Sequence, residues 1–209
     1  MNLGNSASKT AAYVLAFIVT FVAVKYGKEF LFEQQAIAES DERIEKLRED
    51  GSKKHPELTA SEAAGVEPIE RITESLGFET DRNKKMQTAA YSFLGFYFVN
   101  ASERSAFCSE LGISITPYTV AVERLHTREL AVARELTSDT RAQEAKFLAM
   151  LKPQMRKTVV QDMTDLSSSF NVPVSEVCHF LSKNGEAFAQ EMHISKMMPA
   201  VYNALMGGQ

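Results

Sequence analysis

The sequence predicts an all-α protein: a bundle of about five to seven short helices, preceded by a single N-terminal transmembrane helix and a charged connector. Residues 10–24 carry no charge, residues 33–85 are rich in charged side chains, and residues 86–209 repeat apolar side chains at helical spacing with no strand-like alternation. We therefore expect an N-terminal tail (1–9), a transmembrane anchor with its interfacial flank (10–32), the connector (33–85) and an α-helical domain (86–209).

The composition limits the classes of function that the chain can serve. Its 209 residues suffice for one domain of ordinary size and an appendage, and the net charge of −4 gives no general attraction to nucleic acid or anionic lipid. The two cysteines, Cys108 and Cys178, form no CxxC pair, which excludes the usual zinc motifs. They are equally compatible with one disulfide in an oxidising compartment and with two buried thiols.

The uncharged run over residues 10–24 indicates a membrane anchor. As a helix it rises roughly 22 Å at ~1.5 Å per residue, against a hydrocarbon core of ~30 Å. Charged and aromatic flanks can extend this reach, because lysines snorkel and tyrosines lie at headgroup depth. The residues expected to form the anchor and its ends are Lys9, Tyr13, Phe17, Phe21, Lys25 and Tyr26.

Two other interpretations of this run are weaker. A cleaved signal peptide requires a nearby small-x-small site, but the best triplet, residues 36–38, lies beyond a charged stretch. A buried core helix would carry one apolar stripe, whereas this run is apolar on every face. The orientation stays open. Lys9 and the amino terminus stand on one side, Lys25 and Lys28 on the other with Arg43, Lys46 and Arg48 further along, and this count only slightly favours a cytoplasmic C-terminal domain.

The connector contains weaker helical signals. Phe30, Ile37 and Ile44 recur every seven residues, so the anchor helix is expected to continue outward and to end near Gly51. Residues 51–56 then read as a break. Residues 68–77, with Pro68 first and Gly77 as terminator, predict a two-turn helix that docks on the main domain.

The domain itself divides into helices at recognisable caps and breaks. Residues 86–99 predict a buried core helix, with Asn100 as the N-cap of a kink or new helix and Gly112 as a stop. Pro153 either kinks a later helix or starts a fresh one. The remaining expected helices cover residues 116–137, 174–192 and 195–206, and Ser138 with Asp139 caps the one in between.

Methionines gather at the C-terminal end of the domain. They favour core packing over an adaptable partner groove, because they fall on the apolar side of the last helices. The residues concerned are Met192, Met197, Met198 and Met206.

A repeated Glu-x-x-His is the one pattern that indicates a metal. Glu123 with His126, and Glu176 with His179, have the i, i+3 spacing that di-iron carboxylate bundles use. The helical wheel argues against this interpretation, since Glu123, Glu176 and His179 fall opposite the apolar stripes. We expect solvated pairs, with no metal and no cofactor. The further ligands that such a site would need could come from Glu103 or Glu110 and from Glu144, Asp162 or Asp165.

Glu129 is a carboxylate on the apolar stripe of residues 118–136. Burial of an unpaired carboxylate is unfavourable, so a partner from another helix is expected. His193, near a helix junction, has no obvious partner in the sequence.

Residues 166–181 have the spacing of a helix-turn-helix unit. Asn171 would adopt the left-handed turn conformation that glycine usually takes. The following helix offers Glu176, His179 and Lys183, a poor set for reading DNA. Nucleic acid is therefore not expected as a partner. A membrane-linked helix-turn-helix DNA-binding regulator is the first alternative function, and a di-metal carboxylate bundle is the second.

Motifs for catalysis are missing from the sequence. It has no phosphate-cradling glycine loop, no nucleophile beside a placed base and no HExxH, so we name no catalytic residue. The expected function is a membrane-tethered helical binding or scaffold module. Its expected partners are the lipid bilayer, through residues 10–24, and another protein, with homo-oligomer formation left open.

Overall fold

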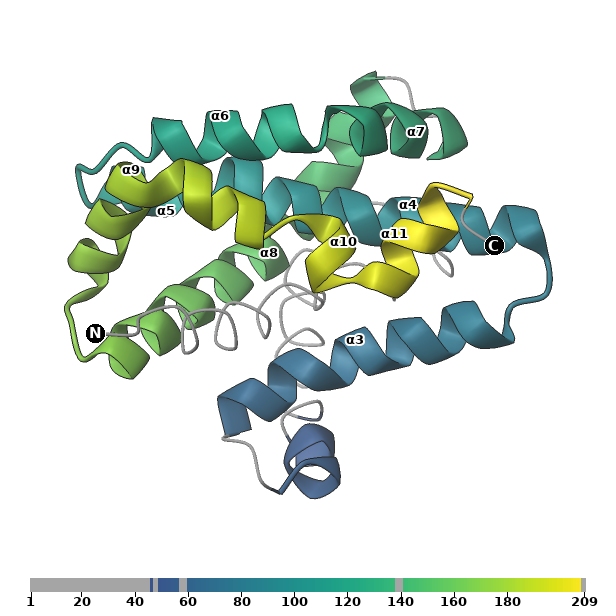
Figure 1. Cartoon of the computed structure of the whole chain (residues 1–209), viewed down its shortest axis with the longest axis horizontal. Coiled ribbons are helices and arrows are strands. Elements are labelled where there is room, and N and C mark those ends of the chain that lie inside the picture. Colours follow the sequence, from purple (N-terminus) through teal and green to yellow (C-terminus); the bar gives the residue numbers. More distant parts are fainter. Residues whose placement is uncertain (1–45, 47–48, 57–59, 138–140, 208–209) are drawn as a thin grey trace.

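The computed structural model describes residues 46, 49–56, 60–137 and 141–207, and the secondary structure of these residues is helical (Figure 1). This confirms the all-α class. The proposed anchor, the heptad positions Phe30, Ile37 and Ile44, and the Ser138-Asp139 cap lie outside the described residues. Among the residues described, no helix combines the length and apolar character that a bilayer crossing requires.

Within the described residues, two of the expected helices are each divided into two shorter ones. Residues 116–137 break at His126, and residues 195–206 break before Pro199, whose nitrogen cannot donate a helical hydrogen bond. The elements are α3 (Ala60–Phe78), α4 (Arg82–Phe98), the π-helical turn η1 (Val99–Glu103), α5 (Arg104–Glu110), α6 (Thr116–Leu125), α7 (Thr127–Thr137), α8 (Arg141–Phe170), α9 (Val174–Glu191), α10 (Ile194–Met197) and α11 (Pro199–Leu205).

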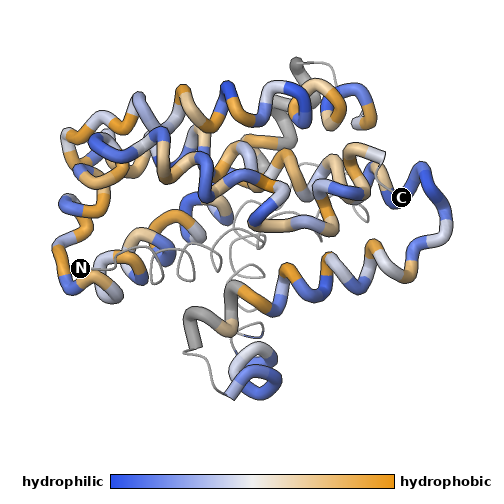
Figure 2. Tube along the Cα trace, in the orientation of Figure 1, coloured by the Kyte–Doolittle hydropathy of each residue, from blue (hydrophilic) through white to orange (hydrophobic). Residues whose placement is uncertain are grey.

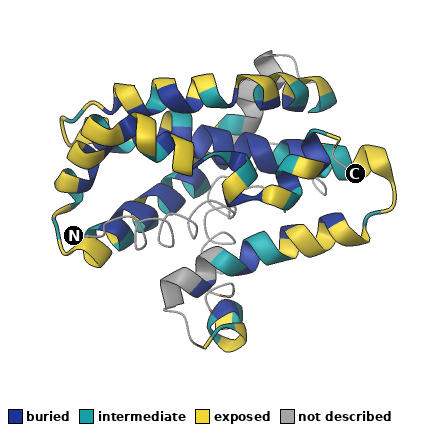
Figure 3. Ribbon diagram, in the orientation of Figure 1, coloured by how far each residue is buried: buried dark blue, intermediate teal, exposed yellow. Residues whose placement is uncertain are grey.

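Helix α4 is the centre of the fold. Asp81 caps its start by accepting hydrogen bonds from the backbone N–H groups of Asn83 and Lys84, at 2.9 and 3.2 Å. It is continuously buried from Ser92 onward, and it packs against α7 and α11 (Figure 3). Hydrophilic and hydrophobic residues are interleaved along the surrounding helices, as expected where each contributes one face to a shared core (Figure 2).

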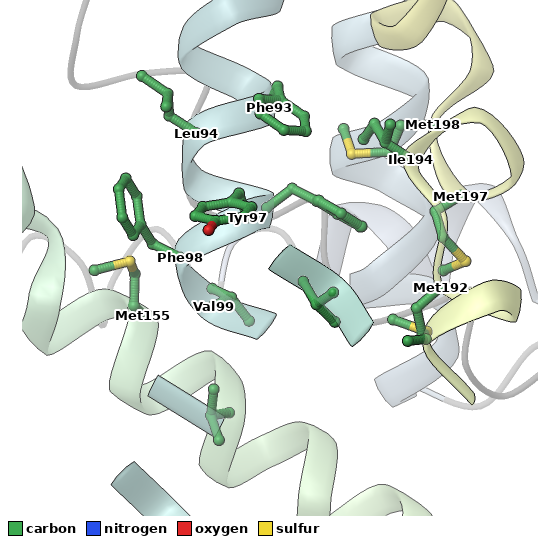
Figure 4. Packing of buried hydrophobic residues seen from close by; sticks show 14 of the residues in the cluster. Phe93, Leu94, Tyr97, Phe98, Val99, Met155, Met192, Ile194, Met197 and Met198 are labelled. Atoms are coloured by element: carbon green, nitrogen blue, oxygen red, sulfur yellow. The ribbon is translucent and has the colours of Figure 1, made fainter. Parts of the chain in front are cut away.

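The C-terminal methionines belong to this core. In Figure 4, Met155 of α8 lies on one side of α4, and Met192, Met197 and Met198 lie on the other. Met192, Met197 and Met198 are buried, and Met206 is partly buried against the same core. Core packing is thus confirmed for these C-terminal methionines over a partner groove.

Helix α3 corrects the prediction for the connector. It contains the predicted helix of residues 68–77 but begins at Ala60, so Pro68 lies inside it. Ile72 and Leu76 are buried in the common core, which confirms that this helix docks on the main domain.

Gly51 does not end a helix as expected. The helical segment continues to Lys54, and a Cβ at Gly51 would lie 2.6 Å from the carbonyl oxygen of Ala63. The glycine therefore permits a close approach to α3, and the break follows at His55 and Pro56.

Gly185 of α9 lies where this helix comes close to the backbone of α6. These two helices pack against each other more extensively than any other pair in the described part of the chain (Figure 1). We expect Gly185→Ala to lower the free energy of unfolding by about 1 to 3 kcal/mol. A Cβ there would lie 2.4 Å from the backbone nitrogen of Tyr118 and 2.7 Å from its Cα, so the two helices would have to separate. Urea denaturation followed by far-UV circular dichroism measures the change.

Gly77→Ala provides the matched control for that measurement. Gly77 is also helical, but a Cβ there would meet nothing within 4 Å. This variant should keep or slightly raise the stability, by up to about 1 kcal/mol. Equal losses in the two variants would contradict the close-packing argument.

Candidate functional site

The structure separates the four residues that the Glu-x-x-His pattern groups together. Glu123, Glu176 and His179 are exposed, as the helical wheel predicts. His126 is fully buried, so its expected solvation is wrong. The side chains of one i, i+3 pair therefore occupy opposite environments, and the pattern finds no support as a metal site.

Among the described residues, a different group brings three metal-ligating side chains together. One atom each from His55, Glu67 and Glu70 lies within 4.8 Å of the others. The two carboxylates already have cationic partners. The Lys54 ammonium lies 2.7 Å from Glu70 Oε2 and 3.3 Å from Glu67 Oε2, and Arg71 Nε donates to Glu67 Oε1 at 2.6 Å. The group is therefore an ion-pair network that joins residues 49–55 to α3.

A buried polar network lies where η1, α5, α6 and α8 meet. Its exposed fractions are 0% for Asn100 and Tyr118, 1% for Arg104 and 2% for Asp162. Tyr118 Oη donates to Asn100 Oδ1 at 2.6 Å, and Asn100 Nδ2 donates to the Phe96 carbonyl at 2.8 Å. Arg104 Nη2 donates to Asp162 Oδ2. The four side chains thus link helices distant in sequence.

Burial controls the electrostatics of this network. Burial raises the pKa of Asp162 to about 6, and the adjacent Arg104 guanidinium, which donates to its Oδ2, opposes that rise. Burial also raises the pKa of Tyr118, which keeps its hydroxyl protonated as the donor to Asn100. Arg104 Nε is buried without a hydrogen-bond partner.

The network shows what the sequence analysis missed. Asn100 is not an N-cap, since the chain continues through the π-helical turn and its amide donates back to Phe96. Asp162 was considered as a metal ligand but pairs with an arginine instead. The spacing of apolar residues does not identify Arg104 as buried, because a buried arginine differs from a surface arginine only in its tertiary surroundings.

The second buried polar group is centred on His126, between α6 and α7. Its Nδ1–H donates to the Val122 carbonyl at 2.9 Å, and its Nε2 accepts the backbone N–H of Ile194 at 3.1 Å. One nitrogen donates and the other accepts, so the ring is neutral. It stacks on His193 with ring centroids 4.7 Å apart and contacts Phe96 edge-on.

Glu129 finds its partner in this group. Its Oε1 lies 3.9 Å from His193 Nε2, so the neighbouring group comes from another element, as expected, and the two form an ion pair only when His193 is protonated. His193 Nδ1 also accepts from the backbone N–H and the hydroxyl of Ser195, at 3.3 and 2.8 Å.

Ser195, His193 and Glu129 have the residue types of a hydrolytic triad, but the local geometry indicates a helix cap. His193 Nδ1, which would take the serine proton, also accepts the backbone N–H of Ser195, the second residue of α10. The next N–H groups, of Lys196 and Met197, donate to the His193 carbonyl at 2.8 and 3.1 Å. They are therefore not free to stabilise an oxyanion. The arrangement caps α10 and holds it beside α6.

His126 should make the stability of the domain depend on pH. Burial, as the largest cause, lowers its pKa in the folded state, so the unfolded chain binds the proton more readily. The contribution is present above the ordinary histidine pKa near 6.5 and is lost as the pH falls below it. Buried carboxyls with raised pKa values, such as Asp162, act in the opposite direction, so the contribution of His126 is read as a difference: between pH 8 and pH 5 the urea midpoint of the wild-type protein should fall relative to that of a variant without this histidine.

Two variants isolate the contribution of His126. His126→Phe should be about 1 to 3 kcal/mol less stable at pH 8, because the Ile194 N–H loses its acceptor, but its stability should fall less toward pH 5. His179→Gln, at an exposed histidine, should keep the wild-type pH dependence. If the urea midpoint of His126→Phe changes with pH as much as that of the wild-type protein, His126 is not the source of the pH dependence.

The two cysteines form a disulfide between α5 and α9. Cys108 and Cys178 are both fully buried, with their Cα atoms 5.6 Å apart. Of the two states that the sequence leaves open, the structure has the bridge.

The predicted turn before α9 is also present. Asn171 has φ of +51°, the left-handed conformation expected of it, and it separates α8 from α9. His179 and Lys183 are exposed on α9, together with Glu176 and Glu186. The backbone of a helix-turn-helix corner is thus present, with a charge pattern unfavourable for DNA.

Comparison with known proteins identifies no relative, since no family model, curated protein or solved structure matches the chain significantly. The function is therefore argued from the residues themselves.

Proposed function

We propose that this protein is a membrane-tethered helical module that acts by binding another protein, without catalysis of its own. The observation that carries the proposal is the uncharged run of residues 10–24, closed by Lys9 and Lys25 and followed by a helical domain. Among the described residues, the Arg104–Asp162 pair, the Tyr118–Asn100 hydrogen bond and the His126–Ile194 hydrogen bond each join separate helical elements. They support a scaffold role rather than a reaction centre.

Membrane fractionation of the full-length chain tests the anchor. The wild-type protein, at its full unprocessed mass, should stay in the high-speed pellet after an alkaline carbonate wash. A variant with Val14→Lys and Ile18→Lys should move to the supernatant, because two charges in the middle of the apolar run oppose its insertion. An unprocessed wild-type chain in the detergent-free supernatant would overturn the proposal.

Crosslinking in intact cells tests the binding role. The wild-type chain should give a discrete crosslinked species that contains a second protein, and the double-lysine variant should lose it because the domain leaves the membrane surface. If the wild-type chain gives only the uncrosslinked monomer, the binding role is wrong even if the anchor is correct.

A second candidate function is DNA binding, favoured by the turn at Asn171. It requires affinity for duplex DNA that falls steeply between 50 and 200 mM salt. Lys183→Glu on α9 should abolish that affinity, and Lys196→Glu, at an exposed lysine on α10, should preserve it. Absence of duplex binding at low salt would eliminate this candidate.

A further inference from the structure

The disulfide constrains where the domain can reside. Cys108 and Cys178 are separated by 70 residues, and both are buried at the contact between α5 and α9. They are the only cysteines of the chain, so no third thiol is present to exchange with the bridge. This arrangement has the features of a structural staple rather than a catalytic dithiol.

Structural disulfides form and persist where the surroundings are oxidising, whereas the cytosol keeps thiols reduced. We infer that the helical domain lies on the exported side of the membrane, outside the reducing cytosol, with the N-terminal tail on the cytosolic side. This orientation rests on the proposed anchor, whereas the oxidising compartment rests on the disulfide alone.

The charge balance around the anchor opposes this orientation only weakly. Lys25 and Lys28 follow the run closely and Arg43, Lys46 and Arg48 follow further along, while Lys9 and the amino terminus precede it. The positive-inside bias depends mainly on basic residues near the ends of the span, and close to this run the two sides balance. The bridge is the stronger signal, because a persistent structural disulfide in the cytosol would be exceptional.

The inference also narrows the class of partner. A domain outside the cytosol meets exported or membrane proteins rather than chromosomal DNA. The partner expected under the proposed function is therefore an exported or membrane-embedded protein. The inferred location argues against the DNA-binding function.

Trapping the redox state of the full-length chain in the cells that make it tests the compartment. Cells are quenched in acid, free thiols are blocked with N-ethylmaleimide in denaturant, the protein is reduced, and the released thiols are labelled with a 5 kDa polyethylene-glycol maleimide. The chain should gain two labels. Cys108→Ser and Cys178→Ser, measured separately, should gain none, because the one remaining thiol is blocked before reduction.

Protease added to intact, right-side-out cells or membranes tests the orientation. It should degrade the helical domain without lysis, while a cytosolic marker stays intact. A membrane-bound chain with no label and full protection would overturn the inference and leave the anchor standing. A labelled chain that the carbonate wash releases would remove the anchor and confirm the oxidising compartment.

Discussion

Replacing Asp162 with alanine is expected to lower the free energy of unfolding by about 3 to 5 kcal/mol, the largest effect of any single substitution considered. Asp162 is the carboxylate that pairs with the buried Arg104, whose Nε already lacks a hydrogen-bond partner. Without it, a guanidinium that is 1% exposed would lose its counter-charge. Urea denaturation of the purified full-length protein in a mild detergent measures the loss.

Two further variants show whether the loss comes from the unpaired charge. Asp165→Asn, three residues along α8 and half-buried, should change the stability by less than about 1 kcal/mol. Arg104→Met combined with Asp162→Leu should recover most of the loss, because well-packed apolar residues can replace a buried ion pair. If the double variant is no more stable than Asp162→Ala, the buried-charge explanation fails.

Removing the disulfide through Cys108→Ala and Cys178→Ala is expected to lower the free energy of unfolding by about 4 kcal/mol. The bridge closes a loop across 70 residues, so its loss increases the conformational freedom of the unfolded chain. The loss should appear as a lower urea midpoint for the double variant than for the oxidised wild-type protein.

Dithiothreitol provides the control for this prediction. A reductant should lower the midpoint of the wild-type protein toward that of the double variant and leave the variant unchanged. Equal midpoints for oxidised wild type and double variant would show that the bridge does not stabilise the domain.

Local patterns predicted the elements that depend on neighbouring residues. The core helix around residues 86–99, the stop at Gly112, the left-handed turn at Asn171 and the helix after it are all present. Periodicity and turn preference act over a few residues, so one sequence suffices to read them. The prediction that a helix begins at Pro68 is wrong. A proline suits the first turn of a helix, but α3 begins eight residues earlier, at Ala60.

The candidate sites were harder to predict, because their members come from distant segments. His126 breaks the expected helix of residues 116–137 at a point where its ring bonds to Ile194, 68 residues away. Glu129 is a partial exception. Its place on an apolar stripe predicted a partner from another helix, although only the structure identified that partner as His193.

The sequence by itself determined the helical class, the core faces of the helices and the uncharged N-terminal run on which the proposed tether depends. These properties follow from the spacing of apolar and charged residues along one chain. Only the tertiary structure decided that Cys108 bonds to Cys178 and that Arg104 pairs with Asp162. Such partners are selected by the packing of whole helices, which brings together residues that share no local pattern.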